Sequence, residues 1–377
     1  MKIFHIVCHT MEQYYPFLKW NIQEFTNLEH SVNVFVQKLH KQDTANEHIL
    51  VNLSSSQTSR TDLVHSDGYK VIVLPWKYFG NEFLQYSKEL LKFVSKEEGI
   101  FHIHGTSNFL FDIISKKLSN KKAIAHHRGW HFTLAAFSLS FPKYFLTFPR
   151  ALKKYKKILV ENPTRKVFFE KKYWIWNEKI EIIPGTLDIE KYTLKEFAPQ
   201  KVTQFLYVGR IEKNKWVYDL LEAFESLKLE NATLRIVWDG SSLVDVKQRF
   251  WWNKQITFYG FVKPEWVIQH LQESDIFVHP SYSDSFGLSV LEALWVWLTI
   301  ISTNVDWPIS ILQQGEKKFW YLYQPWDIQM LKTHMQNAFL DTLETKKMRW
   351  VDWRKRVIDN FTFDVVSKKL SEIYTSL

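Results

Sequence analysis

The sequence is short of glycine and cysteine and lacks a long hydrophobic run. Only 11 of its 377 residues are glycine, about 2.9%, where proteins average about 7%. The single cysteine, Cys8, lies inside the first apolar run, which excludes an internal disulfide framework and predicts a small core residue. The nearest approach to a membrane span, residues 132–141, is too short to cross a bilayer. We therefore expect a globular chain without a transmembrane helix.

The first ten residues also lack the features of a secretory signal. They carry one lysine and a short apolar run that turns polar at once, which is typical of a first buried strand. We therefore expect a cytoplasmic protein.

The net charge of +9 is unevenly placed along the chain. Residues 141–157 combine cations with aromatic side chains, namely Lys143, Arg150, Lys153, Lys154, Lys156, Lys157, Phe141, Tyr144, Phe145, Phe148 and Tyr155. Such a segment favours an anionic membrane surface or an anionic substrate, although a solvated helix face has the same composition. No nucleic-acid module accompanies it. We expect no nucleic-acid partner, and a peripheral location on the inner face of the membrane is one interpretation.

Size and rhythm predict two α/β domains. A chain of 377 residues suits two domains with a cleft between them. In both halves, short β-rich runs alternate with helical stretches, which predicts parallel sheets covered on both faces. The expected strands are 3–7, 32–37, 49–52, 70–74, 100–104, 122–126, 158–160, 205–208, 233–237, 256–259, 275–278, 299–302 and 320–323. The expected helices are 81–97, 108–119, 217–228, 263–272, 288–297 and 327–339.

A basic loop after one expected strand has the character of an anion site. Residues 205–215 run from a strand into a loop that ends where a helix starts. A helix N-terminus offers free N–H groups and a positive dipole end, and Arg210 and Lys215 add full charges. The loop fits a diphosphate, although basic loops after strands are common.

A second segment, residues 275–292, pairs two carboxylates. Asp284 lies on a polar loop, and Glu292 follows eight residues later, about one turn inside the next helix. Both side chains can point into the same crevice, where carboxylate oxygens accept strong hydrogen bonds from sugar or ribose hydroxyls. A surface helix carboxylate is the alternative for Glu292.

Together these motifs make residues 200–355 similar to the retaining glycosyltransferases of family four. The matching pieces, in the family's order and spacing, are Gly209-Arg210 with Lys215, Trp238-Asp239-Gly240, and Asp284 to Glu292 around Phe286-Gly287-Leu288. The resemblance implies a GT-B fold, with two doubly wound Rossmann-like domains facing across a cleft. It places an N-terminal domain at 1–186, a nucleotide-sugar-binding domain at 187–360, and a helix at 361–377 that packs back on the first domain.

The resemblance also implies roles for individual residues. Arg210 and Lys215 would hold the donor diphosphate, and Glu292 would bind the donor ribose. Asp284, where the family usually has Glu, would contact the transferred sugar. The rest of the expected donor site is Gly209, Asp239, Gly240, Phe286, Gly287 and Leu288. The resemblance further implies that the anomeric configuration of the sugar is retained and that no metal is obligatory. The sequence has no Asp-x-Asp motif for a metal. We therefore expect no metal and no cofactor.

In the first half, Ala123–Gly129 is similar to the family's strand that ends in a functional histidine. We expect His127 to be the catalytic residue near the transferred sugar. The expected acceptor-side neighbours are His104, His126, Arg128 and Gly129. A hydrogen-bonded structural group is the alternative for each of them. Residues 8–16 lack the family's glycine-rich acceptor loop, so the acceptor is not specified.

At positions 216 and 238 this chain has tryptophan where the family has glycine. Trp307 and Trp326 also lie where a turn, a helix end or the family pattern would favour glycine. Trp295 or Trp297, and Trp353, likewise occupy such places. The 17 Trp and 11 Gly together make 28 of 377 residues, about 7.4%, which restores the usual glycine content. We hypothesise that these tryptophans come from UGA codons, which the source organism reads as glycine and which were translated here as tryptophan. The alternative is a Trp-rich chain with a crowded donor loop.

The sequence therefore predicts a hexosyl-type glycosyltransferase. It would move a sugar from a UDP- or GDP-type nucleotide-diphosphate sugar to a hydroxyl of a glycan or lipid-linked glycan. A nucleotide-sugar epimerase of the same architecture and a non-catalytic nucleotide-sugar-binding protein are the alternatives.

Overall fold

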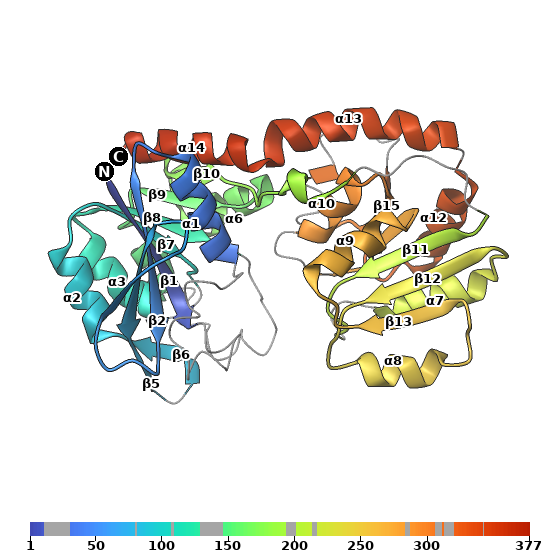
Figure 1. Cartoon of the computed structure of the whole chain (residues 1–377), viewed down its shortest axis with the longest axis horizontal. Helices are drawn as coiled ribbons and strands as arrows, with labels where there is room; N and C mark the ends of the chain where they lie inside the picture. The colour runs from blue at the N-terminus through green and yellow to red at the C-terminus, as the bar shows by residue number, and fades with distance from the viewer. Residues whose placement is uncertain are drawn as a thin grey trace. The chain divides into compact units, whose positions relative to one another are not determined.

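The computed structural model describes residues 1–10, 31–79, 81–106, 109–128, 146–193, 201–212, 217–282, 287–305, 311–312, 320–341 and 343–377. The chain divides into two compact units (Figure 1). The first unit is Met1–Pro184 with Val366–Leu377, and the second is Gly185–Val365. No described helix combines the length and the hydropathy that a membrane crossing needs.

The first unit is built on a sheet of eight described strands in the order β10-β9-β8-β7-β1-β2-β4-β3. In that order the strands are Ile180–Ile182, Lys157–Val160, Lys122–His127, Ile100–His104, Lys2–Thr10, Glu47–Ser54, Lys70–Pro75 and Thr61–Val64. Only β3 pairs antiparallel within the described sheet. The helices of this unit are α1 (Ser31–Gln42), α2 (Lys88–Lys96), α3 (Phe109–Leu118), α5 (Phe148–Leu152), α6 (Pro163–Tyr173) and α14 (Phe363–Thr375), and a hairpin joins β5 (Lys77–Phe79) to β6 (Asn81–Tyr86).

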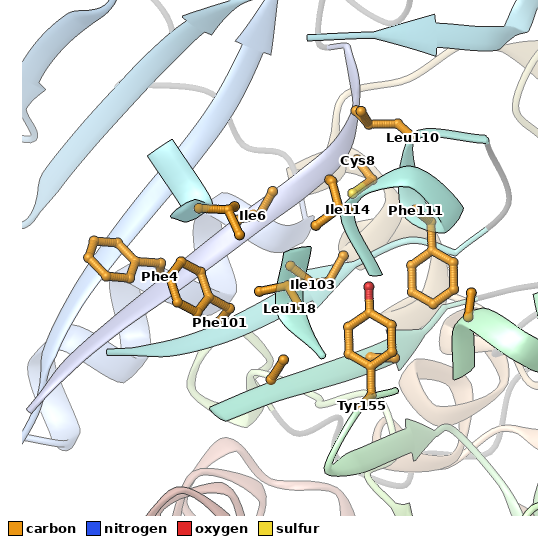
Figure 2. Close-up of a cluster of buried hydrophobic side chains, with 14 of the residues drawn as sticks. Phe4, Ile6, Cys8, Phe101, Ile103, Leu110, Phe111, Ile114, Leu118 and Tyr155 are labelled. Carbon is orange, nitrogen blue, oxygen red and sulfur yellow. The ribbon is translucent and has the colours of Figure 1, made fainter. Parts of the chain in front are cut away.

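Alternation along β1 gives the first sheet two different faces. Phe4, Ile6 and Cys8 point into an apolar core (Figure 2), where Phe4 stacks on Phe101 with ring centroids 5.3 Å apart. Cys8 is 1% exposed, so the prediction of a small core residue is confirmed. His5 points to the opposite face, which is polar and is described below.

Two aromatic residues of the basic segment 141–157 belong to this same core. Phe148 and Tyr155 are fully buried, and Tyr155 stacks on Phe111 with centroids 5.0 Å apart (Figure 2). These two rings hold α5 against α3 and are closed off from any membrane surface. Arg150, by contrast, is exposed.

The second unit is built on a parallel sheet in the order β13-β12-β11-β14-β15-β16, coloured yellow-green to orange in Figure 1. In that order the strands are Ile256–Gly260, Ala232–Val237, Thr203–Val208, Ile276–His279, Thr299–Thr303 and Trp320–Tyr323. The helices are α7 (Val217–Leu227), α8 (Leu243–Phe250), α9 (Pro264–Gln272), α10 (Leu288–Trp295), α12 (Ile328–Leu340) and α13 (Leu343–Phe361). The chain steps outward from β11 to β13 and then returns to the other side of β11, so the strand order reverses between β11 and β14.

The predicted fold class is confirmed, with two local corrections. Residues 32–37, predicted as a strand, lie in α1, because Val32, Phe35, Val36 and Leu39 are buried at helical spacing. Residues 81–97, predicted as one helix, form β6 and then α2. The helix begins only after Ser87, whose hydroxyl accepts a 3.1 Å hydrogen bond from the N–H of Leu90 and so caps the first turn.

Four tryptophans have positive backbone φ, at Trp174 (49°), Trp238 (116°), Trp297 (78°) and Trp326 (68°). They are four of the six described non-glycine residues in this region. Left-handed backbone is costly for bulky L-residues. Trp295 and Trp353, in contrast, lie in helices and are buried in the core of the second unit.

Candidate functional site

The loop that follows β11 carries the expected phosphate-binding arginine. Gly209 continues the strand end, where its N–H donates to the carbonyl of Val237 at 3.2 Å. The Tyr207 hydroxyl donates to the carbonyl of Arg210 at 2.9 Å, which fixes the backbone of the loop. The Arg210 side chain is 51% exposed and pairs with Glu212 at 2.9 Å, a contact that an incoming anion can replace at little cost.

The loop that follows β12 is tied directly to this one. The N–H of Ile211 donates to the carbonyl of Asp239 at 3.0 Å, and the carboxylate of Asp239 accepts from the N–H of Gly240 at 2.7 Å. A Cβ on Gly240 would lie 2.3 Å from the carbonyl oxygen of Ile211. Glycine is therefore required for the two loops to approach each other. Trp238 enters this turn at φ 116°.

The start of α10, on the other side of the strand-order reversal, supplies the second half of the site. Gly287 caps the helix in the left-handed conformation, φ 64°, and Leu288 begins its first turn. The first N–H groups of a helix lack intrahelical partners and carry partial positive charge. Parallel α/β sheets bind ligands at such a reversal, beyond the carboxyl ends of the strands.

Glu292 lies on α10 behind this helix start. Burial raises the pKa of its carboxyl group, while a hydrogen bond from Tyr192 and the charge of Lys191 oppose that shift. The Tyr192 hydroxyl donates to Oε1 of Glu292 at 2.8 Å, which orients the carboxylate. Tyr192 follows the short helix Ile189–Lys191. The sequence motifs did not indicate it, because it lies 100 residues from its partner.

A tyrosine after β14 links three further segments of the second unit. The hydroxyl of Tyr282 donates to Oδ2 of Asp219, in the first turn of α7, at 2.8 Å. It accepts from the N–H of Trp326 at 2.7 Å. Burial raises the pKa of both Tyr282 and Asp219. The sequence motifs did not indicate this link, although Tyr282 lies within residues 275–292.

In the first unit, His127 ends β8 on the apolar side of the sheet. Its Nδ1 lies 2.6 Å from Oγ1 of Thr106, and its ring packs against Phe169 at a centroid distance of 5.0 Å. His126 points to the opposite face, and its ring lies 5.5 Å from that of His104. The structure thus separates His127 from His104 and His126 by the thickness of the sheet.

Arg128 lies closer to the polar side. Its guanidinium lies 4.7 Å from the ring centroid of Phe35, and its charge helps to lower the pKa of His126. Lys215, Asp284, Phe286 and Gly129 lie outside the described residues, as do Trp216 and Trp307. The roles expected for the individual site residues remain predictions.

Comparison with known proteins agrees with this arrangement. Residues 188–352 match the family model of the Glycosyl transferases group 1. This match lies within the second unit and confirms the resemblance to glycosyltransferases that the motifs indicated. A glycogen synthase of Mycobacterium tuberculosis is 23% identical over 202 residues, 52% of this chain and 48% of that protein. An alpha-monoglucosyldiacylglycerol synthase of Acholeplasma laidlawii is 25% identical over 180 residues, 42% of this chain and 44% of that protein. The matched region thus spans less than half of each relative.

Solved structures share the fold over the whole chain. Sucrose-phosphate synthase from Thermosynechococcus elongatus superposes with a TM-score of 0.73 at 14% identity, covering 100% of this chain and 99% of that one. HepE from Anabaena in complex with UDP also gives 0.73, at 13% identity, covering both chains completely. The two-sheet architecture of this chain is therefore the GT-B fold.

Proposed function

We propose that this chain is a retaining glycosyltransferase that transfers a sugar from a nucleotide-diphosphate sugar to a hydroxyl of a glycan or lipid-linked glycan. The observation that carries the proposal is the junction of the loops after β11 and β12 opposite the start of α10, inside the matched domain. Arg210, Gly240 and Glu292 all belong to it. The names of similar proteins support a nucleotide-sugar donor, since HepE was crystallised with UDP and with UDP-glucose.

The chemistry follows from these charges. The helix start, Arg210 and, by resemblance, Lys215 face the diphosphate, where they stabilise the negative charge that grows as the bond between the sugar C1 and the phosphate oxygen breaks. Glu292 accepts hydrogen bonds from the ribose hydroxyls. The acceptor hydroxyl attacks C1 from the face that the diphosphate leaves, and its proton passes to the departing phosphate oxygen. Configuration is then retained without a metal or cofactor.

Nucleoside diphosphate release from a panel of UDP- and GDP-sugars tests the proposal. The panel is run with and without mixed glycan and glycolipid acceptors. We expect acceptor-dependent release with one donor base, and a loss of about 10- to 100-fold in the Arg210→Ala variant. The matched control is Arg249→Ala on α8, because Arg249 is similarly exposed and pairs with Glu222.

Three other outcomes would contradict the proposal. Conversion of the sugar nucleotide without acceptor would identify an epimerase. Donor binding without turnover across the acceptor panel would indicate a non-catalytic binder. Equal loss of turnover in the Arg210 and Arg249 variants would contradict the assignment of Arg210 to a diphosphate-binding site. Retention itself is read by NMR from the anomeric configuration of the product.

A further inference from the structure

The polar face of the first sheet carries five buried histidines that the proposed transfer does not use. They are His5 on β1, His48 on β2, His102 and His104 on β7, and His126 on β8. In the sheet register His5 lies beside His102, and His104 lies beside His126. These rings therefore cluster on neighbouring strands, and each is at most 2% exposed.

Two helices close this cluster off from solvent. Phe35 of α1 lies with its ring centroid 5.7 Å from that of His104. Tyr374 of α14 lies 5.8 Å from the ring of His102, and its hydroxyl is 2.7 Å from Nδ1 of that histidine. A hydrogen bond from Ser367 to Gln42 ties α14 to α1. All of these residues belong to the first unit.

A buried carboxylate sets the proton positions along one chain of rings. Asp43 lies 3.1 Å from Nε2 of His48, so that nitrogen donates to it. Nδ1 of His48 then accepts from Nε2 of His5 at 2.9 Å. Nδ1 of His5 accepts from Nε2 of His104 at 3.0 Å. The chain ends at Nδ1 of His104, a buried lone pair for which the described residues provide no hydrogen-bond partner.

An unpartnered buried nitrogen is costly unless something binds it, and the geometry offers a candidate ligand. One nitrogen from each of His5, His102 and His104 lies within 4.8 Å of the other two. Zinc–nitrogen bonds of about 2.0–2.1 Å in a tetrahedral site place ligand nitrogens roughly 3.4 Å apart. Ligation would use the lone pair of His5 Nδ1 in place of the hydrogen bond that this nitrogen accepts from His104, and shifts of about 1 Å would close the three rings around an ion. We propose that His5, His102 and His104 bind one divalent transition-metal ion of the zinc class, which locks the first unit.

The surroundings of the three rings support this assignment. Burial holds the pKa values of His5, His102 and His104 well below the usual range, so the rings stay neutral, as metal ligands must be. Asp43 acts through His48 on His5, which resembles the carboxylate–histidine support of known metal sites. Among the charges that face the cluster, Asp43 favours a bound cation, whereas the positive guanidinium of Arg128 opposes it.

Metal content measures the site without reference to sugar transfer. Tag-free protein is unfolded in denaturant that contains a chelator, so that any bound metal is removed. It is then refolded with or without one equivalent of Co²⁺ or Zn²⁺ and passed through a desalting column. We expect one ion per chain to be retained, a visible Co²⁺ absorption band typical of a nitrogen-rich site, and a higher melting temperature of the first unit. His5→Gln and His104→Gln should lose the band, and Asp43→Asn should weaken binding by about 10- to 100-fold. The control His334→Gln changes a half-buried histidine of the second unit and should keep the band.

A further measurement on the unmodified chain covers the case in which these variants fail to fold. X-ray absorption of the Zn²⁺ form should show about three imidazole nitrogens near 2.0–2.1 Å. Absence of retained metal, an all-oxygen or sulfur-containing shell, or a cobalt band that survives in both folded histidine variants would overturn the proposal. Because donor turnover is not measured, failure here leaves the proposed transferase function to its own test.

Discussion

At the scale of single residues, the left-handed tryptophans are the least expected feature of the chain. Glycine adopts positive φ freely, whereas a side chain with a Cβ pays about 1–2 kcal/mol there. Trp238 and Trp326 lie at φ 116° and 68°, and both occupy glycine-like positions in the sequence. The backbone geometry thus supports the hypothesis that these residues are glycine in the native protein.

Substitution by glycine tests that hypothesis in the folded chain. Trp326 is 68% exposed, so Trp326→Gly removes little packing and should raise the free energy of unfolding by about 1 kcal/mol. Trp251, 80% exposed with φ −58°, is the matched control, and Trp251→Gly should bring no gain. Thermal and denaturant unfolding measure both. The codons give an independent answer, since UGG at Trp238 and Trp326 would contradict the hypothesis.

Glu292 allows binding to be separated from stability. Its pKa is raised in the folded chain, so folding favours the protonated form. That contribution is complete below the unfolded pKa of about 4.3 and is lost as the pH rises through the folded pKa. At pH 7 Glu292→Gln should therefore unfold no more easily than the parent, yet bind the donor about 10-fold or more weakly. Glu265→Gln, an exposed change on α9, is the control. A marked loss of stability in Glu292→Gln would assign the carboxylate a structural role.

At the scale of elements, the junction of the loops after β11 and β12 depends on one missing side chain. Gly240→Ala places a Cβ 2.3 Å from a backbone oxygen and should cost about 1–3 kcal/mol or more while displacing Arg210's loop. Gly260→Ala meets no atom within 4 Å and carries only the strain of φ 71°, about 1 kcal/mol. Denaturant unfolding with donor titration should show that only Gly240→Ala also loses donor affinity. Similar donor affinity in the two variants would contradict the role of this junction.

The last helix, α14, is expected to hold the histidine-bearing face closed. Leu370 is fully buried there, and Leu370→Ala should destabilise the first unit by about 2–5 kcal/mol. Lys368→Ala, an exposed change on the same helix, should stay within about 0.5 kcal/mol. Hydrogen exchange across β1, β7 and β8 would localise the effect. Unchanged exchange of these strands in Leu370→Ala would count against the role of α14.

At the scale of the whole molecule, the two units should differ in their response to acid. His5, His102, His104 and His126 have strongly lowered pKa values, so they take up protons mainly on unfolding. Their stabilisation is complete above the unfolded pKa of about 6.5 and is lost as the pH falls below it, by up to about 1.4 kcal/mol per pH unit for each histidine. Calorimetry of metal-free protein should resolve two transitions. Between pH 7 and 5.5 the transition of the first unit should move down steeply, and His5→Gln should reduce its slope. Equal shifts of both transitions would contradict this.

The sequence by itself determined the parts of this protein that rest on local pattern. The alternation of strand and helix patterns predicted the two α/β sheets. Gly209-Arg210 and Asp239-Gly240 indicated the loops after β11 and β12, because short motifs at strand ends need particular backbone conformations; the donor-binding role of these loops stays a prediction. It failed at residues 32–37, where β-branched residues concealed a helical period.

Contacts between distant segments were decided only by the tertiary structure. Tyr192 meets Glu292 across 100 residues, and Tyr374 meets His102 across 272. No pattern along the chain predicts such pairs, since they depend on which strands become neighbours. The histidines at positions 5, 48, 102, 104 and 126 look like isolated polar residues in apolar strands. Only the sheet register brings them together on one buried face. There, leaving Nδ1 of His104 without a hydrogen-bond partner is energetically costly, which favours a bound ligand.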